Sequence, residues 1–392
     1  MLIRGASALV GENLTFVDST DISVREGRFC EIRPTIREDS GVVDGSGLLI
    51  IPGLVNCHTH IGDSIAKDVS INTTTHGRVH PVFGAKAKIL GSTSDEHLVQ
   101  FMRATCTSMI RKGITTFVDF REGGAHGVRL LRKAAAGTGI RVIALGRIRS
   151  HQNDIRYDKG LGSTQQAELE DVLRCADGVG ISGANENGDA TLRGYGGVSG
   201  LRAIHAAETE YSSRMSRTKM KRSEVERAML MRPHFVVHMT HASPEDIKRV
   251  AAGTRGIVIC PRANGALAGG VPGLTAMLGA GCPVALGTDN VMVNSPDVLR
   301  EMDYIWKVSM GHDKNRISPI EILKMATVNA SRILSRDVGV IRESAPADCI
   351  LVEKHSLDLE PMHDPHAAVV HRVSESSIRA VMVGGDIVHG SL

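Results

Sequence analysis

Aromatic side chains are scarce in this chain, at 3% of 392 residues. Proteins that bind single-stranded nucleic acid stack bases on exposed aromatic rings, so the scarcity argues against a surface of that kind. The net charge is only +3, which gives no global field that would attract nucleic acid or an anionic membrane. The composition therefore predicts neither a nucleic-acid partner nor a membrane partner.

Long hydrophobic runs and paired cysteines are also missing. No segment reaches the roughly 18 apolar residues of a membrane-spanning helix, and the N-terminal MLIRGASALVGENL, interrupted by Arg4, lacks the features of a signal peptide. The seven cysteines are scattered without a CxxC pair, a usage typical of reducing compartments. We expect a cytoplasmic protein.

Apolar runs alternate with helix-like segments about eight times through the middle of the chain. This alternation is typical of a (β/α)8 barrel, which we favour over a doubly wound sheet. Both ends of the chain instead show short strands and turns. We predict an α/β fold: a TIM barrel over 53–339, with a small β-sandwich built from both termini, 1–52 and 340–392.

Histidine and carboxylate side chains mark the ends of several predicted strands. PGLVNCHTH places two imidazoles on one strand face, because side chains at i and i+2 point the same way. Four strand ends carry such groups: His58 with His60, His205, His238 and Asp289. Functional groups of a barrel lie where strands end and loops begin. Because imidazole and carboxylate are common metal ligands, the pattern predicts a metal site.

These motifs resemble those of the amidohydrolase superfamily over essentially the whole chain. HAAE (205–208) is similar to the HxxE of its aminohydrolase branch, which includes cytosine and S-adenosylhomocysteine deaminases. HMTH (238–241), PRAN (261–264) and LGTDN (286–290) are similar to further motifs of that branch. The resemblance implies a metal-dependent hydrolase that deaminates an amino-substituted N-heterocycle and releases ammonia. The alternative within the superfamily is hydrolysis of a ring amide or a C–Cl bond, as in imidazolonepropionases and chlorohydrolases.

The resemblance also implies the ligands of the metal and the residues of the reaction. One divalent ion is expected, because the fourth predicted strand, DGVGISGANENG, lacks the lysine that bridges two metals in binuclear relatives. Zn²⁺ is the first expectation for this ion, and Fe²⁺ and Mn²⁺ are the alternatives. The implied ligands are His58, His60, His205 and Asp289. In the reaction Glu208 would shuttle protons, His238 would orient the attacking water, and Asp289 would also accept its proton.

Substrate contacts are predicted from position alone. Five polar residues follow predicted strands on the catalytic face: Arg121, Glu122, Arg147, Asn185 and Asn264. For the charged ones, surface ion pairs are the competing interpretation. Nucleoside-deaminating relatives usually carry HSPY after the fourth strand, where this chain has SGANENGD. The basic segment 211–233 is typical of a solvated helix face. A small heterocyclic substrate and water are the expected partners, and the family's dimers and tetramers allow a homo-oligomer.

Overall fold

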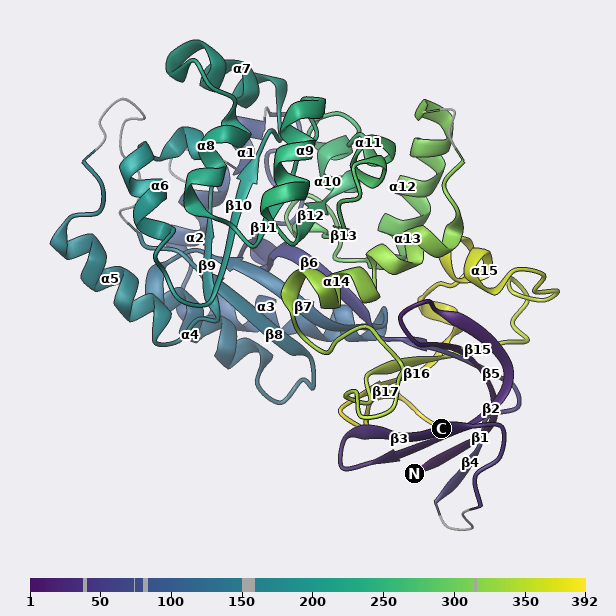
Figure 1. Ribbon diagram of the computed structural model, residues 1–392. Coiled ribbons are helices and arrows are strands. Elements are labelled where there is room, and N and C mark those ends of the chain that lie inside the picture. The colour runs from purple at the N-terminus through teal and green to yellow at the C-terminus, as the bar shows by residue number, and fades with distance from the viewer. Residues whose placement is uncertain (38–40, 74, 80–83, 150–158, 314–315) are drawn as a thin grey trace.

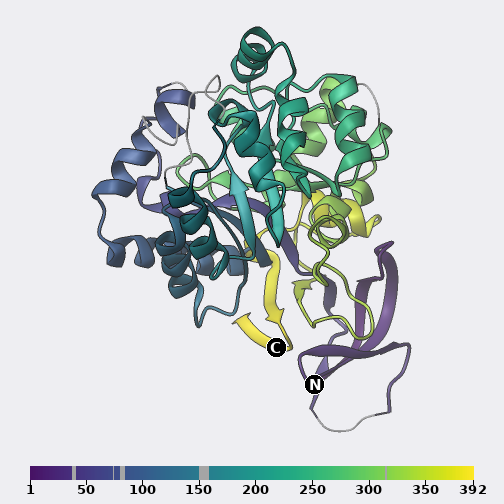
Figure 2. The same cartoon turned by 60° about the vertical axis from the view of Figure 1, so that its left-hand side comes forward.

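The computed structural model describes the whole chain except residues 38–40, 74, 80–83, 150–158 and 314–315. Two sheets organise it, one parallel and surrounded by helices and the other made of strands from both ends of the chain (Figure 1). The two termini lie at the same end of the molecule in Figures 1 and 2. None of the helices in the described part is long and apolar enough to cross a membrane.

The parallel sheet closes into a barrel. Its order is β13-β12-β11-β10-β9-β8-β7-β6-β14. The strands are β6 (Leu54–His60), β7 (Ile114–Arg121), β8 (Arg141–Gly146), β9 (Gly178–Ile181), β10 (Leu201–Ala206), β11 (Phe235–His238), β12 (Gly256–Ile259), β13 (Val284–Leu286) and β14 (Asp289–Asn290). β13 pairs with β12 whereas β14, the next element in the chain, pairs with β6. The two are halves of one eighth strand, and the predicted (β/α)8 barrel is confirmed.

Gly287 allows the eighth strand to approach β6 closely enough to close the barrel. A Cβ atom there would lie 2.7 Å from the Cβ and 3.0 Å from the backbone nitrogen of His58, closer than real Cβ atoms approach. The next residue, Thr288, donates its backbone N–H to the His58 carbonyl at 3.0 Å. The glycine thus lets the eighth strand press against β6, which places Asp289 beside the HxH pair.

Helices cover the outside of the barrel (Figures 1 and 2). Those between successive strands are α1 (Thr75–Val79), α2 (Ala85–Ser92), α3 (Asp95–Arg111), α4 (Gly124–Ala135), α5 (Ser163–Leu173), α6 (Asp189–Tyr195), α7 (Glu210–Met220), α8 (Glu224–Ala228), α9 (Pro244–Gly253), α10 (Pro261–Ala266) and α11 (Leu274–Gly279). After β14 come α12 (Val298–Asp313), α13 (Pro319–Met325), α14 (Val328–Leu334) and α15 (Pro365–His371). Short 3₁₀ turns are η1 (Ile61–Ala66), η2 (Ala184–Glu186), η3 (Met229–Met231) and η4 (Glu375–Ser377). In α3 the buried residues Leu98, Met102 and Met109 recur at helical spacing, so the apolar stripe faces the barrel.

The second sheet joins the two ends of the chain. Its strands are β1 (Leu2–Val10), β2 (Thr15–Arg25), β3 (Arg28–Arg33), β4 (Val42–Asp44), β5 (Leu48–Pro52), β15 (Cys349–Glu353), β16 (Ile378–Val383) and β17 (Asp386–Gly390). The first residues of β1 pair with β4 and later ones with β5, so β4 and β5 follow one another along the same edge of β1. The predicted terminal β-sandwich is confirmed, while the boundaries 52/53 and 339/340 stay a prediction.

Apolar side chains fill the barrel beneath its catalytic end. Alternate residues of the strands point inward and are fully or almost fully buried, among them Cys57, Phe120, Phe235 and Cys260. The Phe120 ring lies 4.3 Å from the ring of His58 and 5.1 Å from that of His205, centroid to centroid. The interior of the barrel is therefore filled with packed side chains, and the histidine rings lie in contact with this layer.

Candidate metal centre and catalytic site

Three histidines and an aspartate converge at the carboxyl ends of the strands. His58 and His60 end β6, His205 lies near the end of β10, and Asp289 opens β14. The Nε2 atoms of His58 and His205 are 3.2 Å apart. Asp289 Oδ1 lies 3.3 Å from His58 Nε2 and 3.6 Å from His60 Nε2. The fold thus brings together all four side chains predicted as ligands.

Hydrogen bonds behind the rings set the direction of the lone pairs. His60 Nδ1 lies 3.0 Å from the Phe120 carbonyl, and His205 Nδ1 lies 2.9 Å from the Ile181 carbonyl. Because a carbonyl only accepts, both Nδ1 atoms carry the proton, and both Nε2 atoms turn a lone pair to the centre. Burial lowers the pKa of His58, His60 and His205, so the imidazoles are neutral, as metal binding requires.

The cluster has the spacing of a four-ligand metal site. Ligand atoms about 2.0–2.1 Å from a tetrahedral zinc ion lie roughly 3.3–3.4 Å from one another, and the measured separations are 3.2, 3.3 and 3.6 Å. An anionic oxygen facing imidazole lone pairs in a buried pocket is an arrangement that a cation stabilises.

A second group adjoins the first and shares Asp289. Glu208 follows β10, and its Oε2 lies 3.7 Å from Nε2 of His238 at the end of β11. Burial, followed by the charges of Asp289 and Glu186, raises the pKa of Glu208 to about 8. Both His238 (φ 74°) and Asp289 (φ 59°) adopt left-handed backbone, a rare conformation for these residues that is often found at functional sites.

Asn264 lies behind His238, and its predicted contact with substrate stays a prediction. Its Oδ1 is 3.1 Å from His238 Nδ1, and its amide nitrogen donates to the Thr240 hydroxyl. The amide is therefore oriented with its oxygen toward the imidazole, so that His238 carries its proton on Nδ1 and turns the Nε2 lone pair toward Glu208. Asn264 is placed to fix the tautomer of His238.

Asn264→Ala is expected to lower kcat about tenfold while leaving KM within about twofold, because a ring free to turn no longer keeps Nε2 in place. Asn264→Asp retains the oxygen that accepts from Nδ1 and should recover most of the loss. Steady-state kinetics of the three proteins measure the effect. Equal loss in both variants would contradict an orienting role.

Three of the predicted substrate residues meet in a buried ion cluster with Lys86 of α2. Glu122 Oε1 lies 2.5 Å from Lys86 Nζ and 3.5 Å from Arg147, and its Oε2 lies 3.7 Å from Arg121. Glu122 Oε1 is also 3.3 Å from His60 Nδ1. Burial alone would raise the pKa of Glu122, but Lys86, His60 and Arg147 hold it well below its usual range. These charges satisfy one another beside the metal cluster, and their contact with substrate stays a prediction.

The loop after β9 is fixed from below by a buried arginine. Arg227 is fully buried and donates to the carbonyls of Ala184 and Asn187 at 2.8 and 2.6 Å, and to Asp189 at 2.8 Å. Within this loop Asn185 donates its amide to the Ser212 carbonyl at 2.7 Å, which ties η2 to α7. A substrate contact through Asn185 stays a prediction. Sequence reasoning missed Arg227 because it lies inside a run of exposed basic residues.

Glu224 is a second buried group that the sequence did not reveal. Its Oε2 accepts from the backbone nitrogen of Ala207 at 3.0 Å and from the Ser212 hydroxyl at 2.8 Å. Ala207, with φ 52°, is the residue just before Glu208. Burial raises the pKa of Glu224 to about 7, so this carboxyl supports the catalytic turn in its protonated form.

The contribution of Glu224 to stability should fall as pH rises from about 4.5 to 7. The unfolded carboxyl of Glu224 ionises near its ordinary pKa of 4.5, whereas the folded one keeps its proton up to about 7. Its contribution is fully present below the unfolded pKa and is lost as pH rises through the folded pKa, a change of roughly 3 kcal/mol. Urea unfolding at pH 4.5 and 7.5 should show that the change in the free energy of unfolding from the lower to the higher pH is more positive in Glu224→Gln than in the parent protein. An unchanged difference would contradict the assignment.

Comparison with known proteins agrees with this geometry. Residues 49–388 match the sequence model of the amidohydrolase family. A putative aminohydrolase of Methanothermobacter thermautotrophicus is 36% identical over 393 residues, 99% of each chain. A 5-methylthioadenosine/S-adenosylhomocysteine deaminase of Pelotomaculum thermopropionicum is 27% identical over 429 residues, 99% of this chain and 93% of the relative.

The fold has counterparts among solved structures. The atrazine chlorohydrolase of Arthrobacter aurescens, complexed with zinc, superposes with a TM-score of 0.84 at 19% identity, covering 98% of this chain and 94% of its own. At that identity the likeness concerns the fold. The sequence match over most of the chain, the barrel and its terminal sandwich together show that this chain belongs to the amidohydrolase family.

Proposed function

We propose that this chain hydrolyses the exocyclic amine of an amino-substituted N-heterocycle and releases ammonia. The observation that carries the proposal is the proximity of a protonatable Glu208 to His238 and Asp289 beside a three-histidine cluster. Deamination needs both a proton donor for the ring and a base for water. The sequence similarity to a deaminase supports the same reaction.

We propose that His58, His60, His205 and Asp289 hold one divalent ion, with Zn²⁺ the first choice. The neutral imidazoles and the carboxylate suit zinc, and Fe²⁺ and Mn²⁺ accept a similar set. Such an ion, when bound, lowers the pKa of water so that hydroxide is available near neutral pH.

The residues of the chain then divide the proton transfers among them. Glu208 in its protonated form donates to the ring nitrogen next to the amino-bearing carbon, which makes that carbon more electrophilic. His238 accepts a hydrogen bond from the attacking water through Nε2, the nitrogen that Asn264 leaves free. Asp289 takes the proton of the water. Asp289 passes this proton to the amine as the C–N bond breaks, and the new hydroxyl returns its proton to Glu208, leaving the oxo-heterocycle and ammonia.

We further propose a cytoplasmic protein with a small heterocyclic substrate and no nucleic-acid or membrane partner. All seven cysteines are free, and five of them are buried, an arrangement suited to a reducing compartment. Because members of the family form dimers and tetramers, we include a homo-oligomer in the proposal.

Ammonia release tests the proposed reaction. The protein is loaded in turn with Zn²⁺, Fe²⁺ or Mn²⁺ and offered aminopurines, aminopyrimidines, their nucleosides, and aminopterins, and chloride release from chlorotriazines is followed in parallel. Ammonia from one subset of the panel, lost in Glu208→Gln, would support deamination. Chloride release, or ring opening without ammonia, would overturn deamination in favour of the alternative hydrolysis.

A further inference from the structure

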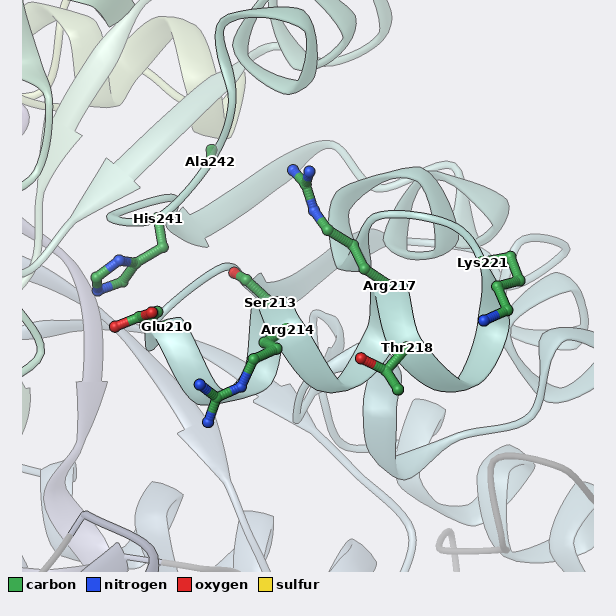
Figure 3. Close-up of a pocket in the computed structure, with 8 residues that line it drawn as sticks. All are labelled: Glu210, Ser213, Arg214, Arg217, Thr218, Lys221, His241 and Ala242. Atoms are coloured by element: carbon green, nitrogen blue, oxygen red, sulfur yellow. The ribbon is translucent and has the colours of Figure 1, made fainter.

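A groove runs along α7 at the edge of the catalytic face. Its volume is about 670 Å³, and the residues that matter here are Glu210, Ser213, Arg214, Arg217, Lys221 and His241. Figure 3 shows Glu210 and His241 beside each other at one end, Lys221 at the other, and Arg217 directed toward the segment of His241 and Ala242. The helix forms one wall, and the loop after β11 forms the other.

The groove begins next to the catalytic pair. Glu210 follows Glu208 by two residues, and His241 follows His238 by three. The start of α7 is held in place, because Asn185 donates to the Ser212 carbonyl and Ser212 donates to Glu224. His241 is fixed on the Gly269 carbonyl at 2.6 Å. The residues at this end of the groove therefore lie two and three residues along the chain from Glu208 and His238.

Three cationic side chains share the face of α7 that lines the groove. Arg214, Arg217 and Lys221 are spaced at i, i+3 and i+7, which places them within about 60° around the helix axis. All three are exposed. Lys219 lies on the opposite side of the helix and does not line the groove.

Most of this positive charge is not neutralised. Arg217 lies 3.8 Å from Asp246, with 56% of its side chain exposed, a geometry in which an ion pair contributes little. No ion pair is found for Arg214 or Lys221 within the described parts of the chain. Glu210 supplies the one carboxylate of the groove lining. Farther along the basic segment 211–233, Arg222 and Arg227 differ, because both pair with Asp189.

We propose that this groove is the subsite for an anionic group of the substrate, a phosphate or a carboxylate carried on the same molecule as the amino-heterocycle. This inference rests on the proposed function for the identity of the reacting ring. At about 1.5 Å per residue along the helix, Arg214 lies roughly 6 Å beyond Glu210 and Lys221 roughly 16 Å beyond it. The anion would therefore be separated from the ring by a spacer of at least about 6 Å.

The side chains suit that ligand. A guanidinium can form two parallel hydrogen bonds to a phosphate or carboxylate, and the lysine adds a mobile positive charge. Because the groove is open to solvent, the attraction should weaken as ionic strength rises. Glu210, at the end nearest the catalytic pair, repels an anion there and favours its placement farther along α7.

Binding of simple anions tests the groove without any reaction. Calorimetric titration of the metal-loaded protein with pyrophosphate and, separately, with succinate should show binding of at least one of the two anions. Binding of pyrophosphate would indicate a phosphate site, and binding of succinate would indicate a carboxylate site. Arg214→Ala/Arg217→Ala should weaken that binding at least tenfold, and Lys219→Ala, which removes one charge from the other face, should not. Absence of binding, or binding unchanged in the double variant, would overturn the proposal. The proposal would also be overturned if the double variant bound bulk RNA more weakly but bound pyrophosphate and succinate as the parent protein does.

Kinetics then tests the link to the substrate. We compare kcat/KM of the parent protein, the double variant and Lys219→Ala on pairs of substrates. The pairs are aminopurine nucleosides with and without a 5′-phosphate, and with and without a carboxylate. The double variant should lower kcat/KM at least tenfold for the anionic member of a pair and less than twofold for its neutral partner. Equal loss on both members would overturn the subsite. If no compound releases ammonia, the proposed function fails, while the anion titrations still decide the groove.

Discussion

Glu208→Gln is expected to lower kcat about a thousandfold. The amide has nearly the same shape as the carboxyl but cannot pass a proton to the ring nitrogen or take one back. The pKa of Glu208, raised to about 8 by burial and by the charges of Asp289 and Glu186, is suited to a group that must hold a proton at neutral pH. The substitution removes this proton transfer and keeps the packing.

Measurements on the same samples separate catalysis from structure. Metal content and melting temperature of Glu208→Gln should equal those of the parent protein, because the three-histidine cluster does not include Glu208. Substrate affinity should be retained, so that the loss appears in kcat. A variant with full metal and near-normal turnover would show that another group transfers the proton.

His205→Ala is expected to lose both metal and activity. His205 Nε2 lies 3.2 Å from His58 Nε2, and removal of this imidazole leaves two histidines and Asp289 to hold the ion. Turnover should fall below detection, and bound metal should fall to a small fraction of one ion per chain. Chelation of the parent protein should give the same inactive state, and added Zn²⁺ should reverse it.

The loss should also appear in stability, which does not depend on knowing the substrate. An ion present at about 1,000 times its dissociation constant stabilises the folded state by about 4 kcal/mol, so zinc should raise the melting temperature of the parent protein and leave that of His205→Ala unchanged. The matched control is His126→Ala, because His126 is a half-exposed histidine that pairs with Asp95. A zinc-dependent melting shift that survives in His205→Ala would contradict the ligand assignment.

The convergence of the proposed ligands could be predicted from sequence because each lies at the end of a local pattern. An apolar run followed by a histidine or an aspartate marks a strand end, and a parallel barrel brings such ends together. His58, His205 and Asp289 thus met as expected even though more than 140 residues separate the first two.

The surroundings of the ligands could not be predicted in the same way. Glu122 follows a predicted strand, but its closest partner, Lys86, is a helix residue with no motif around it. Arg227 belongs to a basic run that predicts exposure, yet it is buried because Asp189 and two carbonyls satisfy its guanidinium. Such pairings depend on how separate elements pack, which periodicity does not encode.

Asn264 shows the same limit for a side-chain orientation. Its position after β12 predicts a place near the substrate, and the fold does bring it to the catalytic end. Which way its amide points is set by Thr240 and His238, and neither contact can be inferred from the motif PRAN.

The central claim is that three imidazoles and one carboxylate of this chain hold a single metal ion. X-ray absorption at the zinc edge, combined with metal analysis of the same sample, tests it most directly. We predict one zinc per chain, bound by three histidine nitrogens and by oxygen at about 2.0–2.1 Å. Two ions per chain, or a sulfur ligand at about 2.3 Å from a buried cysteine such as Cys57 or Cys260, would contradict the account.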